Sequence, residues 1–508
     1  MSRRDCREGE VRLNYFDLLK LAAPEAIVVI AALAALVIDL TSTRELELRL
    51  RLSIGALVSC VGCVAAIAWM IVVPTVGEVG NGMMEVNALT QLVKIGVVAL
   101  TFFTVLLSVN SDFTSHVGEY LALLLLATVG MMFLVSARDV LMIFVALEMT
   151  SLSLYILTAF NKRNVKSAEA ALKYFLFGGM AAAFMLFGLS LLYGLSGSTN
   201  LHEIAVGLKG RGLDPLLVVA IVVTVIGFGF KVAAVPFHLW APDAYEGAPT
   251  PSAAFIASGS KVASFFIFAQ VMAIGFAGAE GSGAWRAFVS GWMPAVALVA
   301  ALSMVLGNLA ALAQSNVKRL IAYSAIAHAG YALLGILAND ERGLASLIYY
   351  VITYGLTTVG AFGVVGVVEH LKGNSNLSDF AGLSKRAPIP AFCMMIFMLS
   401  LAGIPPLAGF FGKFYVFYAA MQAGTPSMGL LWLVILAVAM SAVSFYYYLK
   451  VLKQIYVIEE AGTTTVASNV PLLQQVVLGA VALLVLVLGC FPNLLVGALH
   501  RCFTGGGH

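Results

Sequence analysis

Long runs of apolar residues, separated by short polar stretches, follow one another along most of the chain. Each run is close to or longer than the about 20 residues that a helix needs to cross a bilayer. The runs lie at roughly 17–39, 51–73, 89–109, 117–136, 138–159, 166–195, 215–240, 251–276, 292–313, 319–338, 343–369, 388–421, 429–456 and 471–490. Since a bilayer admits only helices or a closed barrel, and runs this long exclude barrel strands, the pattern predicts an all-α polytopic membrane protein of about 14 transmembrane helices.

The composition agrees with this pattern. Of the 508 residues, 61% are hydrophobic and 11% are charged, and the mean hydropathy is +0.97. Soluble chains are about 25% charged, so this chain lacks the polar surface that water demands. The first apolar run is not followed by a small-residue cleavage site, so we expect it to be an uncleaved span.

Motifs for redox groups or nucleotides are not apparent. Cys60 and Cys63 form a C-x-x-C inside an apolar run, but zinc and iron–sulfur sites need further ligands at recognisable spacing. Gly412-Lys413 is not a phosphate loop, because Leu407 and Phe414 stand where such a loop has glycine and serine or threonine. We therefore expect no cofactor and no NADH to bind to this chain.

Basic residues are distributed unevenly between the loops, and cytoplasmic loops carry the excess of lysine and arginine. Loops after odd-numbered helices hold thirteen: Arg44, Arg49, Arg51, Lys162, Arg163, Lys166, Lys318, Arg319, Lys372, Lys385, Arg386, Lys450 and Lys453. Loops after even-numbered helices hold five: Arg138, Lys209, Arg211, Arg286 and Arg342. The odd loops are predicted to be cytoplasmic and both termini to be outside, although the basic N-terminal tail argues the other way.

Two predicted helices are interrupted by prolines. Residues 227–251 read GFGFKVAAVPFHLWAPDAYEGAPTP in the seventh helix, and residues 401–417 read LAGIPPLAGFFGKFYVF in the twelfth. Proline removes a backbone donor and clashes with the preceding turn, so helices 7 and 12 are expected to be discontinuous. Paired broken helices in corresponding positions of two halves are typical of an ion site in a transporter.

A short repeat accompanies the two breaks, because residues 227–231 and 409–413 share the pattern G-F-x-x-K. Taking helices 4–8 and 9–13 as repeats of five spans gives the two halves opposite topologies. The predicted organisation is three N-terminal helices (1–110), a first antiporter-like repeat (111–280), a second inverted repeat (285–460), and a C-terminal helix with a tail (461–508).

Ionisable residues occur inside several spans, where each costs at least about 2.5–3.5 kcal/mol and is by default a functional hypothesis. The set is Glu148, Lys173, Lys231, Lys261, His328 and Lys413. Lys173 could instead snorkel from a helix end, and His328 could be a hydrogen-bonded packing residue. For Glu148, Lys231, Lys261 and Lys413, a purely structural explanation is less favoured. Lys94, Glu25, Asp39 and Glu369 lie near span ends, where anchoring or capping is expected.

The chemistry of these residues follows from desolvation. Burial disfavours a charged lysine, while a nearby carboxylate favours it, so a lysine whose carboxylate partner approaches or withdraws can hold or release a proton. His238 follows Lys231 by nominally two helical turns, and histidine suits a relay. Lys261, between the two broken helices in sequence, could pass a proton from one half to the other.

Three segments carry a family resemblance. Residues 227–265, the stretch NVKRLIAYSAIAHAGYALLG at 316–335 and residues 399–417 closely resemble the antiporter-like subunits of respiratory complex I. The resemblance is strong over roughly 120–455 and implies fourteen helices with inverted repeats. It assigns the family's buried residues to Glu148, Lys173, Lys231, His238, Lys261 and Lys413. A lysine at 413, where the sister subunit M has glutamate, favours subunit N.

The resemblance implies a proton-translocating subunit in the membrane arm of a bacterial NADH:quinone oxidoreductase, in the cell inner membrane. NADH, FMN, iron–sulfur clusters and quinone are then expected in partner subunits, and the antiporter-like subunit M and the small subunits K and J as neighbours. Two rival hypotheses are a subunit of a multi-component sodium/proton antiporter, and a scaffold whose buried charges only hold helices together.

Overall fold

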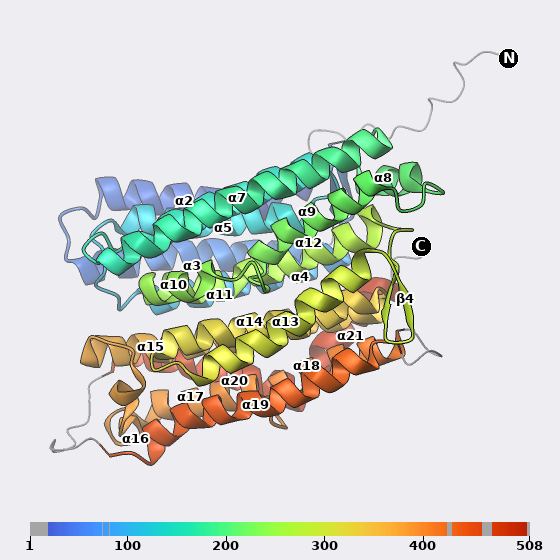
Figure 1. Cartoon of the computed structure of the whole chain (residues 1–508). Coiled ribbons are helices and arrows are strands. Elements are labelled where there is room, and N and C mark those ends of the chain that lie inside the picture. The colour runs from blue at the N-terminus through green and yellow to red at the C-terminus, as the bar shows by residue number, and fades with distance from the viewer. Residues whose placement is uncertain (1–18, 74, 81, 424–428, 460–469, 505–508) are drawn as a thin grey trace.

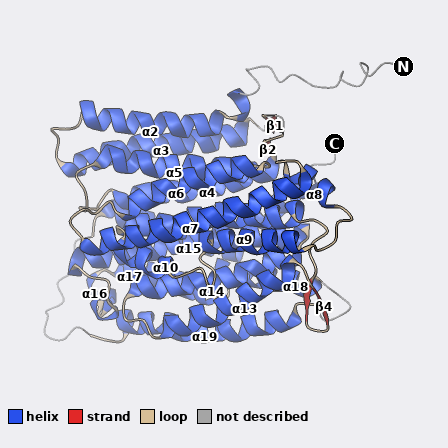
Figure 2. Ribbon diagram, turned by 45° about the horizontal axis from the view of Figure 1, so that its top comes forward, coloured by secondary structure: helices blue, strands red, loops and turns tan. Residues whose placement is uncertain are grey.

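A computed structural model describes residues 19–73, 75–80, 82–423, 429–459 and 470–504 of the chain (Figure 1). Twelve helices of this part are long and apolar enough to cross a membrane, and two shorter apolar helices are α9 (Pro215–Lys231) and α17 (Pro388–Ala402). Figure 2 shows these helices lying side by side along one common direction. The prediction of a helical, multi-pass membrane protein is confirmed.

The helices of the first half are α2 (Ala23–Thr41), α3 (Leu48–Val72), α4 (Ala88–Ser108), α5 (Val117–Ser136), α6 (Val140–Thr158), α7 (Val165–Ser196), α8 (Leu201–Leu208), α9, α10 (Trp240–Gly247), α11 (Thr250–Ala257) and α12 (Gly259–Gln270), which continues as a π-helical turn at Val271–Gly275. The second half has α13 (Trp292–Leu312), α14 (Val317–Ala338), α15 (Glu341–Lys372), a 3₁₀ turn at Leu377–Phe380, α16 (Leu383–Arg386), α17, α18 (Ala408–Gln422), α19 (Leu431–Tyr456), α20 (Leu472–Cys490) and α21 (Asn493–Thr504).

Two short hairpins were not predicted. Strand β1 (Gly77–Val79) pairs with β2 (Met84–Val86), and β3 (Ser282–Ala284) pairs with β4 (Ala287–Val289), both antiparallel. Helices α8 and α21 were not predicted either, because each is too short to give a membrane-length apolar run. We call the end of the bundle that carries α8 and the hairpins the hairpin face. The opposite end, with α16 and the loops at 42–47, 109–116, 159–164 and 313–316, is the basic face (Figure 1).

Polar caps determine where the site-bearing helices begin. Asp214 accepts a hydrogen bond from the Leu217 N–H, and Pro215 occupies the first helical position of α9, where its missing N–H costs nothing. Asn316 caps α14 by accepting from the Arg319 N–H. These caps set the register in which α9 delivers Lys231 to its end and α14 delivers His328 to the bundle interior.

Both predicted helix breaks are present. The first separates α9 from α10, and Ala233 within it has a left-handed φ of 56°. The second separates α17 from α18 around Pro405 and Pro406. The G-F-x-x-K match is nevertheless misleading, because Lys231 is the last residue before its break whereas Lys413 lies in the half-helix after its break. The two lysines are therefore not in equivalent positions, and the five-residue match does not define the register of a repeat.

The three N-terminal helices contain a buried ion pair that was not predicted. Lys94 Nζ on α4 donates to Glu25 Oε1 on α2 at 2.6 Å, and the two side chains are 2% and 4% exposed. The expectation that these residues anchor span ends is therefore wrong. Asp39 does act as a cap, because it accepts the Gly118 N–H in the first turn of α5 and also pairs with Arg51 at 2.8 Å.

The tight contact between α13 and α14 depends on glycine. A Cβ added to Gly330 would lie 2.8 Å from the Ala300 carbonyl oxygen, and one added to Gly307 would lie 2.5 Å from the Ala327 nitrogen. Both distances are closer than packed atoms tolerate. The glycines let the two backbones approach, as small residues do in membrane helix pairs, and they set the position of His328 on α14.

Gly330→Val should destabilise the protein by about 1–3 kcal/mol, because the added side chain forces α14 away from α13. The measurement is the thermal unfolding midpoint of the purified, detergent-solubilised protein. Gly194→Val is the matched control, since a Cβ at Gly194 meets nothing within 4 Å. Equal midpoints for the two variants would contradict the packing argument.

Lys94→Met should lower the amount of folded protein, because it leaves the Glu25 carboxylate buried without its cation, which costs about 3–5 kcal/mol. The double variant Lys94→Met with Glu25→Gln should recover much of that loss, since no unpaired charge remains. Folded yield is read from the monodisperse peak in size-exclusion chromatography. A double variant as poor as the single one would show that packing, not charge, sets the stability at this site.

Candidate functional site

A row of buried basic residues crosses the middle of the bundle. Lys231, Lys261, His328 and Lys413 are all buried, and they come from α9, α12, α14 and α18. Four elements far apart in sequence thus deliver ionisable groups to the interior, away from both lipid and bulk water. Four of the seven residues singled out by sequence are therefore buried in the interior, and a fifth, Glu148, lies beside Lys231.

Lys231 stands at one end of this row, beside Glu148. Its Nζ lies 3.8 Å from Glu148 Oε1 and donates a hydrogen bond to Ser151 Oγ. Glu148 Oε1 has no hydrogen-bond partner among the described residues. The pair is therefore held by electrostatic attraction across a gap that a small movement of α6 would widen.

Glu148 lies at the border of the protein surface. Its side chain is 25% exposed, and it shares the outward face of α6 with the exposed side chains of Val145 and Leu152. A neighbouring subunit or lipid would therefore touch the helix that carries this carboxylate. The position makes Glu148 accessible to a push from outside the chain, while Lys231 stays inside.

Lys261 follows Lys231 along the row. It lies in the first turn of α12, and its Nζ donates to the Val232 carbonyl oxygen at 2.5 Å. Val232 immediately follows Lys231 at the end of α9, where helix carbonyls are unpaired and the helix dipole attracts a cation. The same Nζ lies 5.7 Å from the centre of the Trp240 ring. The break after α9 therefore places Lys231 and Lys261 at the same helix terminus.

His328 occupies the middle of the second half. Its Nδ1 lies 2.7 Å from the Tyr350 hydroxyl and its Nε2 lies 3.0 Å from the Tyr448 hydroxyl. The Tyr448 hydroxyl lies 2.5 Å from Ser324 Oγ. A neutral imidazole donates through one nitrogen and accepts through the other, and a hydroxyl can do either. The tyrosines therefore give His328 a polar contact on each side, as a proton relay requires.

Lys413 stands at the far end of the row. Its Nζ donates to the Ala402 carbonyl oxygen at 3.1 Å and to Ser441 Oγ at 2.8 Å. Ala402 is the last residue of α17, so this lysine also sits at a helix end freed by a break. The Lys413 Nζ lies 5.1 Å from the Tyr331 ring centre, and the Tyr331 ring lies 5.6 Å from the His328 ring. Tyr331 thus separates His328 from Lys413.

Lys173 lies apart from the row. It pairs with Glu169 at 2.7 Å and Asp243 at 2.8 Å, and its side chain is 41% exposed. Asp243 and Glu246 on α10 also bind Arg319 of α14, at 2.8 Å and 3.0 Å. We call these five side chains the α10 ion cluster. Lys173 therefore contacts the half-helix after the first break and not the buried lysines.

His238 also lies outside the row. It lies within the first break, between the exposed Pro236 and Leu239, and is half-buried, and its Nδ1 has no hydrogen-bond partner among the described residues. The contact between Lys231 and Lys261 is made through Val232, without the histidine. The nominal two-turn spacing does not hold, because the break ends the helix at Lys231.

Several residues of the site were missed from sequence. Ser151, Tyr350, Tyr448 and Ser441 contact the buried basic groups. Ser151 could have been found, because it lies three residues after Glu148 and therefore on the same face of the helix. The other three come from distant helices, and their sequence surroundings resemble those of many ordinary polar residues in spans. Asp243 and Glu246 lie within the proline-rich stretch that drew attention, but only α10 shows that they share a face.

No group of three or more His, Cys, Asp or Glu side chains that could hold a metal ion occurs in the described part of the chain. What the arrangement offers chemically is a series of groups that each gain or lose one proton. Lys261 reaches the Val232 carbonyl beside Lys231, and Tyr331 lies between His328 and Lys413, with one carboxylate at the Lys231 end. Such a series can move protons between its ends when the charge beside Lys231 changes.

Comparisons with known proteins show the family to which the chain belongs. Residues 137–443 match the family described as NADH:quinone oxidoreductase/Mrp antiporter, TM. The chain is 52% identical over 492 residues to NADH-quinone oxidoreductase subunit N 2 of Acidobacterium capsulatum, covering 95% of this chain and 98% of the relative. It is 38% identical to NADH-quinone oxidoreductase subunit N of Anaeromyxobacter sp., covering 92% and 93%.

Solved structures show the same fold. A chain of respiratory complex I from Thermus thermophilus with bound Aureothin superposes with a TM-score of 0.76 at 33% identity, covering 94% of this chain and 99% of that chain. A chain of the Mrp complex from Dietzia sp. superposes with a TM-score of 0.80 at 20% identity, covering 96% and 98%, which shows the shared fold alone. By sequence and by structure, the chain belongs to the NADH-quinone oxidoreductase subunit N family of antiporter-like membrane proteins.

Proposed function

We propose that the chain is a proton-translocating subunit of the membrane arm of a bacterial NADH:quinone oxidoreductase, respiratory complex I. The observation that carries the proposal is the buried row Lys231, Lys261, His328 and Lys413, in a chain that belongs to the subunit N family over nearly its whole length. The chain is thus part of an enzyme whose redox chemistry takes place in other subunits. NADH, FMN, iron–sulfur clusters and quinone bind to those partners.

The proposed architecture has fourteen spans. The twelve long apolar helices are joined by two discontinuous spans, α9 with α10 and α17 with α18. Helices 4–8 then correspond to α5–α12 and form the first repeat at 111–280. Helices 9–13 correspond to α13–α19 and form the second at 285–460. A broken span is the fourth of five in each half, which supports the repeat, and five spans per half invert one relative to the other.

The basic face lies on the cytoplasmic side of the inner membrane in this proposal, and both termini lie outside. The thirteen-to-five distribution of basic residues between odd and even loops supports this orientation. The antiporter-like subunit M and the small subunits K and J are the proposed neighbours. One of them would touch the outward face of α6, where Glu148 lies.

The mechanism begins at the pair of Glu148 and Lys231. Two unit charges at this separation attract by on the order of 4 kcal/mol at an effective dielectric of 20. A push on α6 that moves Glu148 away removes this stabilisation, and Lys231 then gives up its proton. Lys261 receives it at the shared end of α9, His328 carries it into the second half between its two tyrosines, and Lys413 releases it toward the hairpin face.

Two members of the predicted set take different roles. Lys173 would hold α10 in place through Asp243, so that the break keeps Lys231 and Lys261 together. His238 would exchange protons with Lys231 only if the stretch after the break rearranges, because it is half-buried and apart from the row.

Lys231→Ala and Glu148→Ala should each lower proton translocation per NADH oxidised by several fold while the complex still assembles, because the proton loses its first carrier or the charge that controls it. The measurement is quenching of a pH-sensitive dye in inverted membrane vesicles, normalised to NADH oxidation and to complex content. Lys209→Ala, an exposed lysine on the hairpin face, is the control. Unchanged translocation in both site variants would contradict the assigned roles.

Lys413→Arg should fail to restore the translocation that Lys413→Ala loses. Arginine keeps the positive charge and can bind the Ala402 carbonyl, but it does not release its proton in proteins. The two variants are compared in the same vesicle measurement, with assembly checked on native gels. If the arginine variant pumped like the wild type, the lysine would serve as a fixed structural charge, as the scaffold hypothesis holds.

A sodium/proton antiporter subunit remains the second candidate function, because the Mrp complex chain has the same fold. Native electrophoresis of solubilised membranes separates the two. The complex I assignment requires that the chain migrate in a band that oxidises NADH. Migration in a band without that activity, together with sodium-dependent proton exchange, would support the antiporter.

A further inference from the structure

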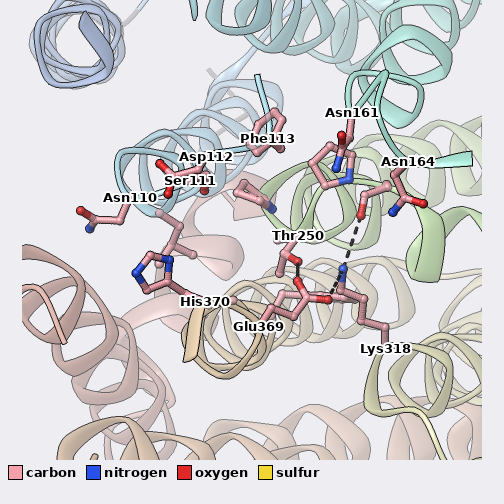
Figure 3. A pocket seen from close by; sticks show the side chains of 18 of the residues that line it. Asn110, Ser111, Asp112, Phe113, Asn161, Asn164, Thr250, Lys318, Glu369 and His370 are labelled. Carbon is pink, nitrogen blue, oxygen red and sulfur yellow. Dashed lines mark hydrogen bonds and ion pairs between the residues drawn. The ribbon is translucent and has the colours of Figure 1, made fainter. Parts of the chain in front are cut away.

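A polar cavity of about 300 Å³ opens on the basic face, where the two proposed repeats meet (Figure 3). The ends of α4, α11, α14 and α15 surround it, together with the loops at 110–113 and 161–164. Asn110, Asp112, Asn161 and His370 contribute polar groups to its wall. None of the seven residues predicted as the site lines it, so the proposed function leaves this cavity unexplained.

An ion pair lies in the wall of the cavity. Lys318 Nζ lies 2.8 Å from Glu369 Oε1, and the two side chains are 5% and 27% exposed. The other carboxylate oxygen of Glu369 accepts a hydrogen bond from the Thr250 hydroxyl, and Lys318 also donates to the Ala248 carbonyl oxygen at 3.4 Å. Figure 3 shows these side chains pointing toward one another. The bonds join α14 and α15 of one repeat to the start of α11 in the other.

The three helices that carry these residues lead directly to the buried row. Going inward, α11 and α12 run from Thr250 to Lys261, and α14 runs from Lys318 to His328. Each step is about 15–17 Å at 1.5 Å per helical residue. Lys318 therefore lies roughly three helical turns from His328 on α14, and Thr250 lies a similar distance from Lys261 along α11 and α12.

Buried hydroxyls occur along the interval. Tyr245, Ser252, Tyr354 and Thr358 each have a buried side-chain oxygen with no hydrogen-bond partner among the described residues. They lie on α10, α11 and α15, and the Tyr354 ring lies 4.9 Å from the His328 ring. Buried polar groups in native proteins are almost always satisfied, by ordered water where no protein group reaches them. This stretch is therefore suited to a file of water molecules.

We propose that Glu369 is the group that takes up protons from the cytoplasm, and that its ion pair with Lys318 is the gate of the uptake path. The inference rests on the proposed proton-translocating function. The arrangement with Lys318 Nζ 2.8 Å from the carboxylate is the closed state of this gate. When Lys318 withdraws, Glu369 binds a proton from water in the cavity, and its O–H then donates to the water file. Lys261 accepts the proton and reloads Lys231 after Lys231 has given up its own, which returns Glu369 to the carboxylate.

The gate is coupled to the first helix break. Arg319, the residue after Lys318, binds Asp243 and Glu246 of α10 at 2.8 Å and 3.0 Å. Trp240 at the start of α10 donates to the Phe230 carbonyl oxygen at 3.0 Å and lies under Lys261. A shift of α10 caused by changes at Lys231 would pull on residues 318 and 319 together. Opening of the gate can therefore follow the charge state of the row.

The first test uses Glu369→Gln in the assembled complex within inverted vesicles. Glutamine keeps the size and accepts the Thr250 bond but cannot carry a proton, so at least half of the proton translocation per NADH oxidised should be lost. Glu369→Asp should recover part of it, which a purely structural role would not predict from the shorter side chain. Glu45→Gln, an exposed carboxylate on the basic face, is the matched control.

Lys231→Ala in the same assay separates the gate from the proposed function. If Lys231→Ala stops translocation while Glu369→Gln translocates normally, the gate is wrong and the proposed function stands. If Lys231→Ala also translocates normally, the proposed function itself is wrong.

A second test needs no pumping and remains decisive if Glu369→Gln fails to assemble. Thr358→Cys places a thiol on α15 about 16 Å inward of Glu369 at 1.5 Å per helical residue, in a background whose native cysteines are replaced. A membrane-impermeant cationic thiol reagent added on the cytoplasmic side should react slowly with it, and several-fold faster when Lys318→Gln is added. Equal rates in the two backgrounds would show that Lys318 does not control access, and the gate would be overturned.

Discussion

The structure depends on one constraint, which is that an amine held away from water needs permanent polar partners. In a continuous transmembrane helix the backbone carbonyls accept hydrogen bonds from N–H groups of the same helix. The sides of such a helix therefore offer no free acceptor to a buried amine. The two helix breaks remove this limit, because each exposes unpaired carbonyls at a helix C-terminus, where the helix dipole also favours a cation. Lys261 uses the Val232 carbonyl at the end of α9, and Lys413 uses the Ala402 carbonyl at the end of α17. The prolines thus provide binding sites for the buried lysines.

This constraint explains how much could be predicted from sequence. Apolar runs and prolines are local signals, so the helical multi-pass architecture, both breaks and the buried Lys231, Lys261 and Lys413 were found. The partners of those lysines come from other helices, and helix contacts across the bundle leave no local signal. Tyr350 and Tyr448 were missed for that reason, and Lys94 and Glu25 were wrongly taken for anchors. The G-F-x-x-K match failed because a five-residue pattern carries no information about which side of a break it lies on.

The α10 ion cluster binds the half-helix after the first break to both proposed repeats. Ionic contacts tie α10 to α7 through Lys173 and to α14 through Arg319. Trp240 ties its start to α9. A half-helix with polar links to both repeats can move as a unit only if several of those links change together. That property is what a two-state coupling element requires, in contrast to a continuous span whose packing is fixed along its length.

The charges along the row make its two ends different for a bound proton. Lys231, Lys261, His328 and Lys413 are all basic, so two protons on neighbouring members repel each other, and the row favours few protons at a time. The carboxylate of Glu148 at one end makes Lys231 the preferred place for a proton while the pair is closed. When Glu148 moves away, that preference is lost. Which basic residue then binds the proton depends on the hydrogen-bond partners of each residue in the row. In the proposed mechanism, one movable negative charge at one end therefore suffices to load and unload the row of basic groups, without any change in the groups themselves.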